Sequence, residues 1–318
     1  MTRTHAPVAP ESGMAADGQP WIETTFADGS VWIDLEQVSE PVLAKLGRRF
    51  GFHRLALEDA ASELQRPKVD VYDGYLFAVL HLPEAFAGSE LRAWELNAFL
   101  APRVLVTYAR GHPPLAGRVP APEPRTGIDL AQLQLYWILD RALSRCEPLL
   151  DEIAGALALL DRETARADRV DAGTVGQLSR AKQQVISYRR LIGPDRTAVS
   201  RLERARSDVV GDAFRPYLAD VGDTIERVWE QLAGFKEVAE GLEETNESRM
   251  AHHQNAVLQR LTVISVLGLP LALISGMPGM NIGGIPLRQD PAGFWIITGV
   301  FALVAAVLAL LFKRLDWF

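Results

Sequence analysis

Residues 276–286 read Gly-Met-Pro-Gly-Met-Asn-Ile-Gly-Gly-Ile-Pro, a glycine-rich run between two long apolar stretches. The first stretch covers 261–274 and extends back to Ala256; the second, 294–312, contains no ionisable side chain. A helix that crosses the hydrocarbon core of a bilayer needs about 20 mostly apolar residues. Glycine and proline break helices, and the exposed backbone is tolerated only at the membrane surface or around a water-filled path. The sequence therefore predicts a membrane hairpin with spans 256–278 and 293–312 around a loop at 279–292.

The composition places most of the chain outside the membrane. The 318 residues carry a net charge of -7, and 23% of them are charged, mostly before the two apolar stretches. This acidic balance argues against a nucleic-acid partner and suits cations. Cys146 is the only cysteine, which excludes a disulfide framework within one chain. Residues 1–18 lack the apolar segment of a signal peptide and are expected to be disordered.

The charges that flank the hairpin predict its orientation. Lys313 and Arg314 follow the second stretch, and Arg249 and Arg260 surround the start of the first. The intervening loop carries only Arg288, offset by Asp290. Because positive residues favour the cytoplasmic side, we expect a multi-pass protein with both termini in the cytoplasm, including a C-terminal segment at 313–318.

The region before the hairpin divides into two parts joined by a proline-rich linker at 112–127. Residues 19–111 have the pattern of a cytoplasmic α/β domain. Its expected helices are 41–50 and 54–64, and its expected strands are 21–26, 31–35, 69–72, 75–82, 91–100 and 104–108. Residues 128–255 are helical in pattern and form the predicted stalk region.

Helical periodicity dominates the stalk region and continues into the first span. One helix is expected at 175–192, ended by Gly193-Pro194. From Pro216 the period continues without a strong breaker to Pro270 and Gly276. At 1.5 Å per residue such a helix is roughly 90 Å long, so it is predicted to carry a cytoplasmic stalk directly into the bilayer.

Acidic side chains recur on this helix before it reaches the apolar stretch. Two sets, which we call the stalk acids, each share one helical face: Asp223, Glu226 and Glu230, and then Glu237, Glu240, Glu244 and Glu247. Several such helices around a vestibule would concentrate cations. A solvated helix face explains the same pattern, although like charges at this spacing slightly destabilise a lone helix.

One face of the first span combines polar, small and aliphatic residues. This set, which we call the span stripe, comprises Asn255, Leu258, Leu261, Thr262, Ser265, Leu269, Ala272 and Gly276. Around an axis of identical helices the stripe would line a narrow apolar conduit, and such constrictions gate by dewetting. Ordinary helix packing in lipid uses the same spacing of small residues.

The remaining chemistry-bearing residues do not form a catalytic arrangement. His252 and His253 are adjacent and point in different directions on a helix, so they lack the spacing of a zinc chelate. No ordered Ser/His/Asp set, phosphate-binding glycine loop or zinc-ligand spacing is found in the sequence. We therefore expect neither an enzyme nor a bound cofactor.

Several motifs resemble those of one membrane protein family. Gly279-Met280-Asn281 stands directly after the first span, and the runs 255–264 and 269–276 precede it. Leu57-Glu58-Asp59-Ala60, Arg66-Pro67-Lys68-Val69 and 72–77 add to the likeness. Together they resemble the CorA-type divalent cation transporters over nearly all of the chain from Trp21 onward.

The resemblance implies a homopentameric CorA-like funnel in the inner membrane. Each subunit would contribute an α/β cytoplasmic domain, a long stalk helix that becomes the pore-lining span, and an outer second span. Gly279, Met280 and Asn281 would form the outer mouth, where the Asn281 amides meet the hydrated ion. Asn255 would form a polar ring at the inner end, and Leu258, Leu261 and Leu269 would form an apolar gate.

The loop after the signature bears on the transported ion. The magnesium-transporting members typically continue with an aromatic residue and an acidic Met-Pro-Glu loop, whereas here Leu287 follows Pro286. The form Asn-x-Gly-Gly-x-Pro at 281–286 resembles the zinc-transporting ZntB branch. We expect Zn²⁺ as the substrate, with Mg²⁺, or Co²⁺ or Ni²⁺, as the alternative. A membrane-anchored sensor or adaptor, with the hairpin serving only as an anchor, is the competing interpretation.

Overall fold

Six β-strands form one mixed sheet in the computed structural model, which describes residues 21–63, 65–166, 172–205, 209–276 and 292–314. The strands are β1 (Trp21–Thr25), β2 (Val31–Leu35), β3 (Lys68–Tyr72), β4 (Tyr75–Ala87), β5 (Glu90–Ala101) and β6 (Val104–Arg110). Their spatial order is β1-β2-β6-β5-β4-β3, with β2 and β6 parallel and the other neighbours antiparallel. Gly29 and Gly74 turn two of the hairpins at φ 79° and 78°, which glycine adopts at no steric cost.

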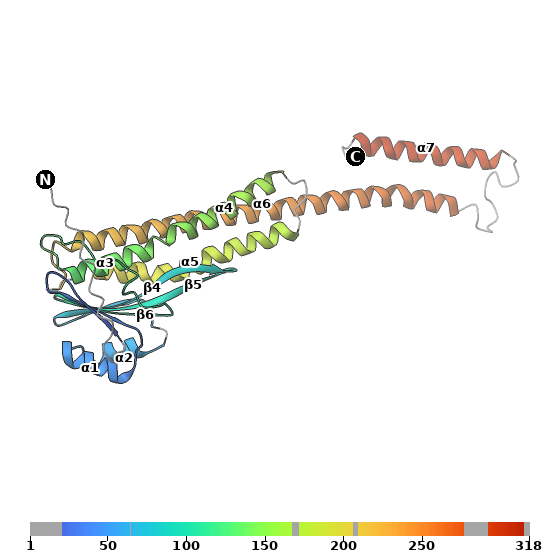
Figure 1. The fold of residues 1–318 in the computed structure, drawn as a ribbon. Coiled ribbons are helices and arrows are strands. Elements are labelled where there is room, and N and C mark those ends of the chain that lie inside the picture. Colours follow the sequence, from blue (N-terminus) through green and yellow to red (C-terminus); the bar gives the residue numbers. More distant parts are fainter. Residues whose placement is uncertain (1–20, 64, 167–171, 206–208, 277–291, 315–318) are drawn as a thin grey trace, which may run out of the picture. The chain divides into compact units, whose positions relative to one another are not determined.

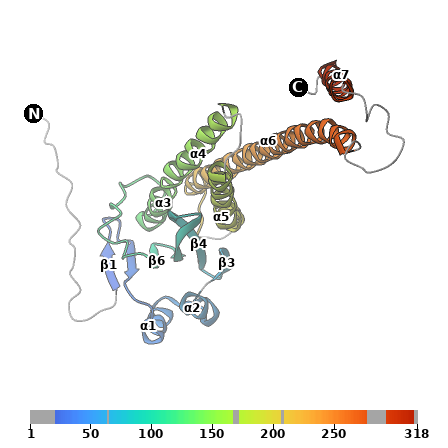
Figure 2. The same cartoon turned by 90° about the vertical axis from the view of Figure 1, so that its right-hand side faces the viewer.

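Helices cover both faces of this sheet (Figures 1 and 2). The shorter pair, α1 (Glu40–Phe50) and α2 (Arg54–Ala61), covers one face, and α3 (Leu130–Leu143), α4 (Cys146–Arg166), α5 (Ala172–Glu203) and the beginning of α6 (Arg215–Gly276) cover the other. Side chains alternate between the faces along a strand. In β4, Phe77 and Val79 join the core under α1 and α2, whereas Leu76 and Leu80 join the core under α3 to α6.

The strands and helices predicted for residues 21–110 are confirmed, with β4 and β5 longer than expected and α2 ending at Ala61. The predicted continuous helix from Pro216 to Gly276 is also confirmed as α6, which has 62 residues. The expectations for residues 1–18 and for the loop at 279–292 lie almost wholly outside the described residues.

One helix boundary was predicted wrongly. Gly193-Pro194 does not end its helix, because α5 continues through Pro194 to Glu203. Proline removes one backbone hydrogen bond and normally breaks a helix, but here the surrounding contacts hold the segment in place. Ile192 is fully buried, and a Cβ added at Gly193 would lie 3.2 Å from the Trp229 ring. Tertiary packing therefore overrides the local helix-breaking signal.

The chain divides into two compact units within α6. The first contains Met1–Ala165 and Ala172–Leu242, and the second contains Arg166–Asp171 and Glu243–Phe318. The second unit includes α7 (Gly293–Arg314), with a mean hydropathy of 2.6. Among the described residues, α7 is the one helix identified as long and apolar enough to cross a membrane.

A carboxyl group is buried where α5 meets the sheet. Asp195 Oδ1 accepts a hydrogen bond of 2.9 Å from the backbone N–H of His81, and Asp195 Oδ2 has no hydrogen-bond partner among the described residues. Apolar side chains, including Leu80 and Ile192, surround the group. Burial raises the pKa of Asp195 to about 8, because desolvation outweighs the bond from His81.

The pH dependence of stability tests this buried acid. Between about pH 4 and 8 the folded chain retains a proton on Asp195 that the unfolded chain has released, so the free energy of unfolding should fall as pH rises. His81 acts in the same direction, because Glu95 raises its pKa in the fold. Asp195→Asn removes the Asp195 titration and should flatten the dependence of Tm on pH. Thermal unfolding of full-length wild type and Asp195→Asn in detergent, at several pH values, measures this dependence. Identical Tm profiles for the two proteins, or a wild-type Tm that rises with pH, would contradict the raised pKa of Asp195.

Candidate functional site

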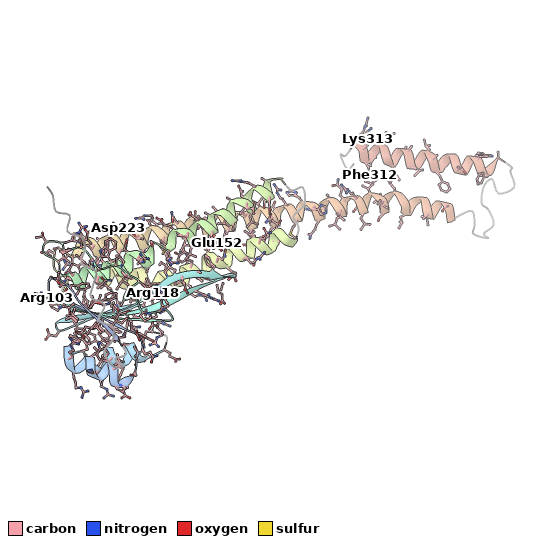
Figure 3. All side chains as sticks on the ribbon, in the orientation of Figure 1. Arg103, Arg118, Glu152, Asp223, Phe312 and Lys313 are labelled. Atoms are coloured by element: carbon pink, nitrogen blue, oxygen red, sulfur yellow. The ribbon has the colours of Figure 1, made fainter. Side chains whose placement is uncertain are left out.

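Helix α6 carries every predicted site residue except the three of the Gly-Met-Asn motif in the loop that follows it. Gly279, Met280 and Asn281 lie outside the described residues, so their geometry is not part of the structure described here. Of the others, Asp223, Glu226, Glu230, Glu237 and Glu240 belong to the first unit, and the remainder belong to the second. Figure 3 labels Asp223 on the first part of the helix.

In the first unit, α6 buries one apolar face and exposes the stalk acids. The buried positions recur three and four residues apart and comprise Leu218, Val221, Ile225, Val228 and Leu232. This is the spacing of a helix whose one stripe packs on a core. Asp223 and Glu230 are exposed between these positions, as are Glu237 and Glu240 further along. The stalk acids therefore remain accessible to solvent within one chain.

Ion pairing separates the stalk acids into two kinds. Glu226 binds Arg196 of α5 through two contacts, one of them 2.7 Å long between Arg196 NH2 and Glu226 Oε1. Glu240 pairs with Lys236 at 3.1 Å. No ion pair is found, in the part of the chain that is described, for Asp223, Glu230, Glu237, Glu244 and Glu247. Because Arg196 lies 30 residues from Glu226 in the sequence, helical spacing gave no signal for this pairing.

In the second unit the span stripe lies on an open face of α6. Leu258, Leu261 and Leu269 expose 59%, 58% and 74% of their surface, and the other stripe residues are exposed as well. Thr262 Oγ1 donates to the carbonyl of Leu258 at 2.8 Å, and Ser265 Oγ donates to that of Leu261 at 2.9 Å. Both hydroxyl protons are thus used within the helix, so the oxygens present acceptor lone pairs outward.

The chain's own atoms cover a different face of this helix. Among the side chains described after Met250 in α6, the shielded ones are Ala256, Gln259, Val263 and Leu267, and Val263 is only 3% exposed. With 3.6 residues per turn, they lie roughly 145° around the helix from the middle of the span stripe. Helix α7 shows the same spacing of shielded positions at Phe301, Val304, Leu308 and Phe312. The stripe is therefore left open, whereas the nearly opposite face is occupied.

The described residues hold no group of three or more His, Cys, Asp or Glu side chains placed to bind a metal ion. His252 and His253 are exposed side chains of α6. The described part of α6 thus offers two features that could act on a cation. Its unpaired carboxylates attract a cation over a distance, and the hydroxyl and amide oxygens on its apolar face can accept hydrogen bonds from the water around the ion.

Comparison with known proteins assigns the chain to a class. The model of the family described as "CorA-like Mg2+ transporter protein" matches residues 27–314. The chain belongs to this family, and it is therefore a transporter of divalent metal cations and a membrane protein rather than an enzyme.

Individual relatives place the chain within the range of the family. The cobalt/magnesium transport protein CorA of Thermotoga maritima is 25% identical over 300 residues, covering 92% of this chain and 85% of that protein. The zinc transport protein ZntB of Yersinia pseudotuberculosis is 28% identical over 142 residues, covering 45% of this chain and 43% of that protein. The structure of the CorA magnesium transporter from Methanocaldococcus jannaschii shares the fold, with a TM-score of 0.76 at 19% identity over 92% of this chain and 93% of that one.

Neutralising the unpaired stalk acids should slow metal uptake. The combined replacement of Glu237, Glu244 and Glu247 by Gln removes three negative charges per chain and should lower the initial uptake rate by up to about tenfold at low ionic strength. The deficit should shrink with added salt, because the Debye length falls from about 30 Å at 0.01 M to about 8 Å at 0.15 M. Flux into proteoliposomes at several salt concentrations measures both effects.

Glu226→Gln supplies the control for this experiment. This variant removes one negative charge and leaves Arg196 unpaired, so it should lower the uptake rate less than the triple replacement, which removes three. Equal rates for wild type and the triple variant at low salt would show that the stalk acids are only a solvated face.

Proposed function

We propose that the chain forms a homopentameric pore for divalent cations in the inner membrane. Residues 256–278 and 293–312 would span the bilayer in each subunit, with both termini and the first unit in the cytoplasm. The apolar length of α7 and the positive residues Lys313 and Arg314 at its end support this topology. A pentamer of such subunits would place five copies of α6 around one axis.

The open face of α6 is the observation that carries the pore proposal. Its span stripe runs from Asn255 to Gly276, while the nearly opposite face at Val263 is covered by the same chain. A helix in lipid that served only as an anchor would have no reason to gather Asn255, Ser265 and Thr262 on the uncovered side. Facing a shared axis, the same residues would form a narrow conduit with polar groups near its inner end and an apolar section that dewets when narrow.

Conduction along this face would proceed with the ion largely hydrated. The span stripe supplies no carboxylate or thiolate to replace water in the first coordination shell. Small divalent ions such as Mg²⁺ give up their water reluctantly. In this proposal the amide oxygens of Asn281 accept hydrogen bonds from the hydration shell at the outer mouth, which Gly279, Met280 and Asn281 would form together.

Zinc is the proposed substrate, with magnesium, cobalt or nickel as the alternative. The Asn-x-Gly-Gly-x-Pro form at 281–286 and the partial match to a zinc transport protein favour zinc. The match to a cobalt/magnesium transport protein over most of both chains supports the alternative substrates, magnesium and cobalt. A loop with one acid, Asp290, next to Arg288 also lacks the net negative charge that would attract hydrated Mg²⁺.

Asn281→Ala should abolish metal flux without unfolding the protein, because it removes the proposed ring of amide oxygens. Asn281→Gln, which keeps the amide, is the matched control and should retain part of the flux. Uptake of Zn²⁺, Mg²⁺ and Co²⁺ into proteoliposomes is compared for the three proteins, with thermal unfolding as the check on folding. Undiminished flux through Asn281→Ala would refute the role of the amide. Uptake of Mg²⁺ but not Zn²⁺ by the wild-type protein would show that magnesium, not zinc, is the substrate.

Cysteine accessibility should distinguish a pore from an anchor. Ser265→Cys and Ala272→Cys lie on the span stripe and should react with a water-soluble thiosulfonate, whereas Val263→Cys and Leu267→Cys on the covered face should not. The wild-type chain is a suitable background, because Cys146 is fully buried and burial raises the pKa of its thiol to about 11. Mass spectrometry of labelled membranes gives the extent of reaction. Uniform protection at all four positions would support the sensor or adaptor interpretation.

A further inference from the structure

A cationic pocket lies at the edge of the α/β layer of the first unit, away from α6. It has a volume of about 180 Å³ and is lined by residues of β4, β5, α3, the turn between α3 and α4, and the segment that follows β6. Three of the lining side chains are the arginines Arg118, Arg141 and Arg145, and the single lining acid is Glu84. We propose that this pocket binds a phosphate group, either free inorganic phosphate or the phosphoryl group of a small organic phosphate.

The charges of the pocket are unbalanced. Within the residues that the structure describes, none of the three guanidinium groups has a carboxylate partner, in contrast to Arg196 on Glu226. Arg141 lies in the last turn of α3, and Arg145 lies in the turn between α3 and α4. A helix C-terminus attracts cations, which accounts for Arg141 but not for Arg145 or Arg118, because these two lie outside α3. An anion between them would relieve the repulsion of all three.

The wall that carries Arg118 is held in place by a buried carboxylate. Asp34 Oδ2 accepts hydrogen bonds from the backbone N–H groups of Leu115 and Ala116 at 2.5 and 2.8 Å. Asp34 Oδ1 accepts from Thr107 Oγ1 at 2.6 Å, and Leu115 itself is only 3% exposed. The segment predicted from the sequence as a linker is therefore pinned to the sheet here. Arg118, labelled in Figure 3, is an exposed side chain three residues after the anchored Leu115, so the segment that carries it is held in place before a ligand binds.

The lining also includes an aromatic pair and an irregularity of the sheet. The rings of Trp94 and His112 lie 4.7 Å apart, and His112 Nδ1 is 2.7 Å from the carbonyl of Pro113, which fixes the imidazole. The ladder between β4 and β5 shifts register between Pro83 and Ala85, a bulge of the kind often found beside binding sites. The lining thus combines aromatic and apolar groups with the three arginines.

Phosphate is the anion that best fits this arrangement. A guanidinium group donates two parallel hydrogen bonds to a phosphate or a carboxylate, but three guanidinium groups need an acceptor with more than two oxygens. The cavity holds about six waters at roughly 30 Å³ each, which is room for a phosphate and a small attached group. A folded macromolecule would not enter such a volume, and a chain of net charge -7 is unsuited to nucleic acid.

Calorimetric titration of the full-length protein in detergent tests the proposal, with inorganic phosphate added at constant ionic strength against chloride. Saturable binding is expected, and Arg118→Gln and Arg141→Gln should each weaken it by at least about tenfold, because each removes a charged hydrogen-bond donor. Arg48→Gln is the matched control: it removes the same charge from the exposed face of α1, across the sheet, and should leave the dissociation constant unchanged. A second titration uses a nucleoside monophosphate. If it binds more tightly than inorganic phosphate, the ligand is an organic phosphate; if it binds more weakly, the ligand is inorganic phosphate.

Protection from phenylglyoxal gives a second measurement that needs no variant. Phosphate should slow the modification of Arg118, Arg141 and Arg145 in the wild-type protein, and should not slow that of Arg48. The proposal is overturned if no saturable binding occurs, if chloride reproduces the effect, if Arg48→Gln weakens binding as much as Arg118→Gln, or if phosphate protects all four arginines alike.

Discussion

The backbone hydrogen bonding of α6 is the constraint on which the rest of the structure depends. An uninterrupted helix satisfies its own N–H and C=O groups, so it can continue from water into hydrocarbon without exposing unpaired polar groups. Its surface changes instead: buried leucines and valines up to Leu242, acidic residues around Glu244, and exposed apolar side chains from Val257 onward. One helix of 62 residues thus carries three kinds of surface in succession, and a break in its central part would interrupt the link between the first unit and the second.

Local periodicity explains what the sequence predicted correctly. Strand alternation, the Asp28-Gly29 and Asp73-Gly74 turns, and the long period of α6 are all set by neighbouring residues. The family could be predicted because short motifs, above all Gly279-Met280-Asn281, are specific to it. Pro194 shows the limit of such reasoning, because the contacts that hold α5 together at Gly193 come from Trp229, 36 residues further along the chain. A local breaker signal carries no information about these contacts.

Long-range pairing explains what sequence reasoning missed. The stalk acids look equivalent along the helix, yet Arg196 of α5 neutralises Glu226 and leaves Glu230 unpaired. Asp34 and Asp195 look like ordinary acids of a strand and a helix, yet one anchors the segment after β6 and the other is buried against β4. The arginines of the cationic pocket come from two separate segments, so only the folded chain brings them together.

The apolar surface of the second unit carries the argument for assembly. Leu258, Leu269 and Leu273 of α6 expose 59%, 74% and 67% of their surface, and Trp295 of α7 exposes 73%. A patch of this kind is not stable in water and marks contact with lipid or with another chain. Lipid suffices for α7, whose exposed residues are almost all apolar. The face of α6 with Asn255, Thr262 and Ser265 differs from α7: Thr262 and Ser265 donate their hydroxyl protons to carbonyls of their own helix, and Asn255 stands just before the predicted span. In the proposed pentamer this face would line the shared axis and meet water or another subunit.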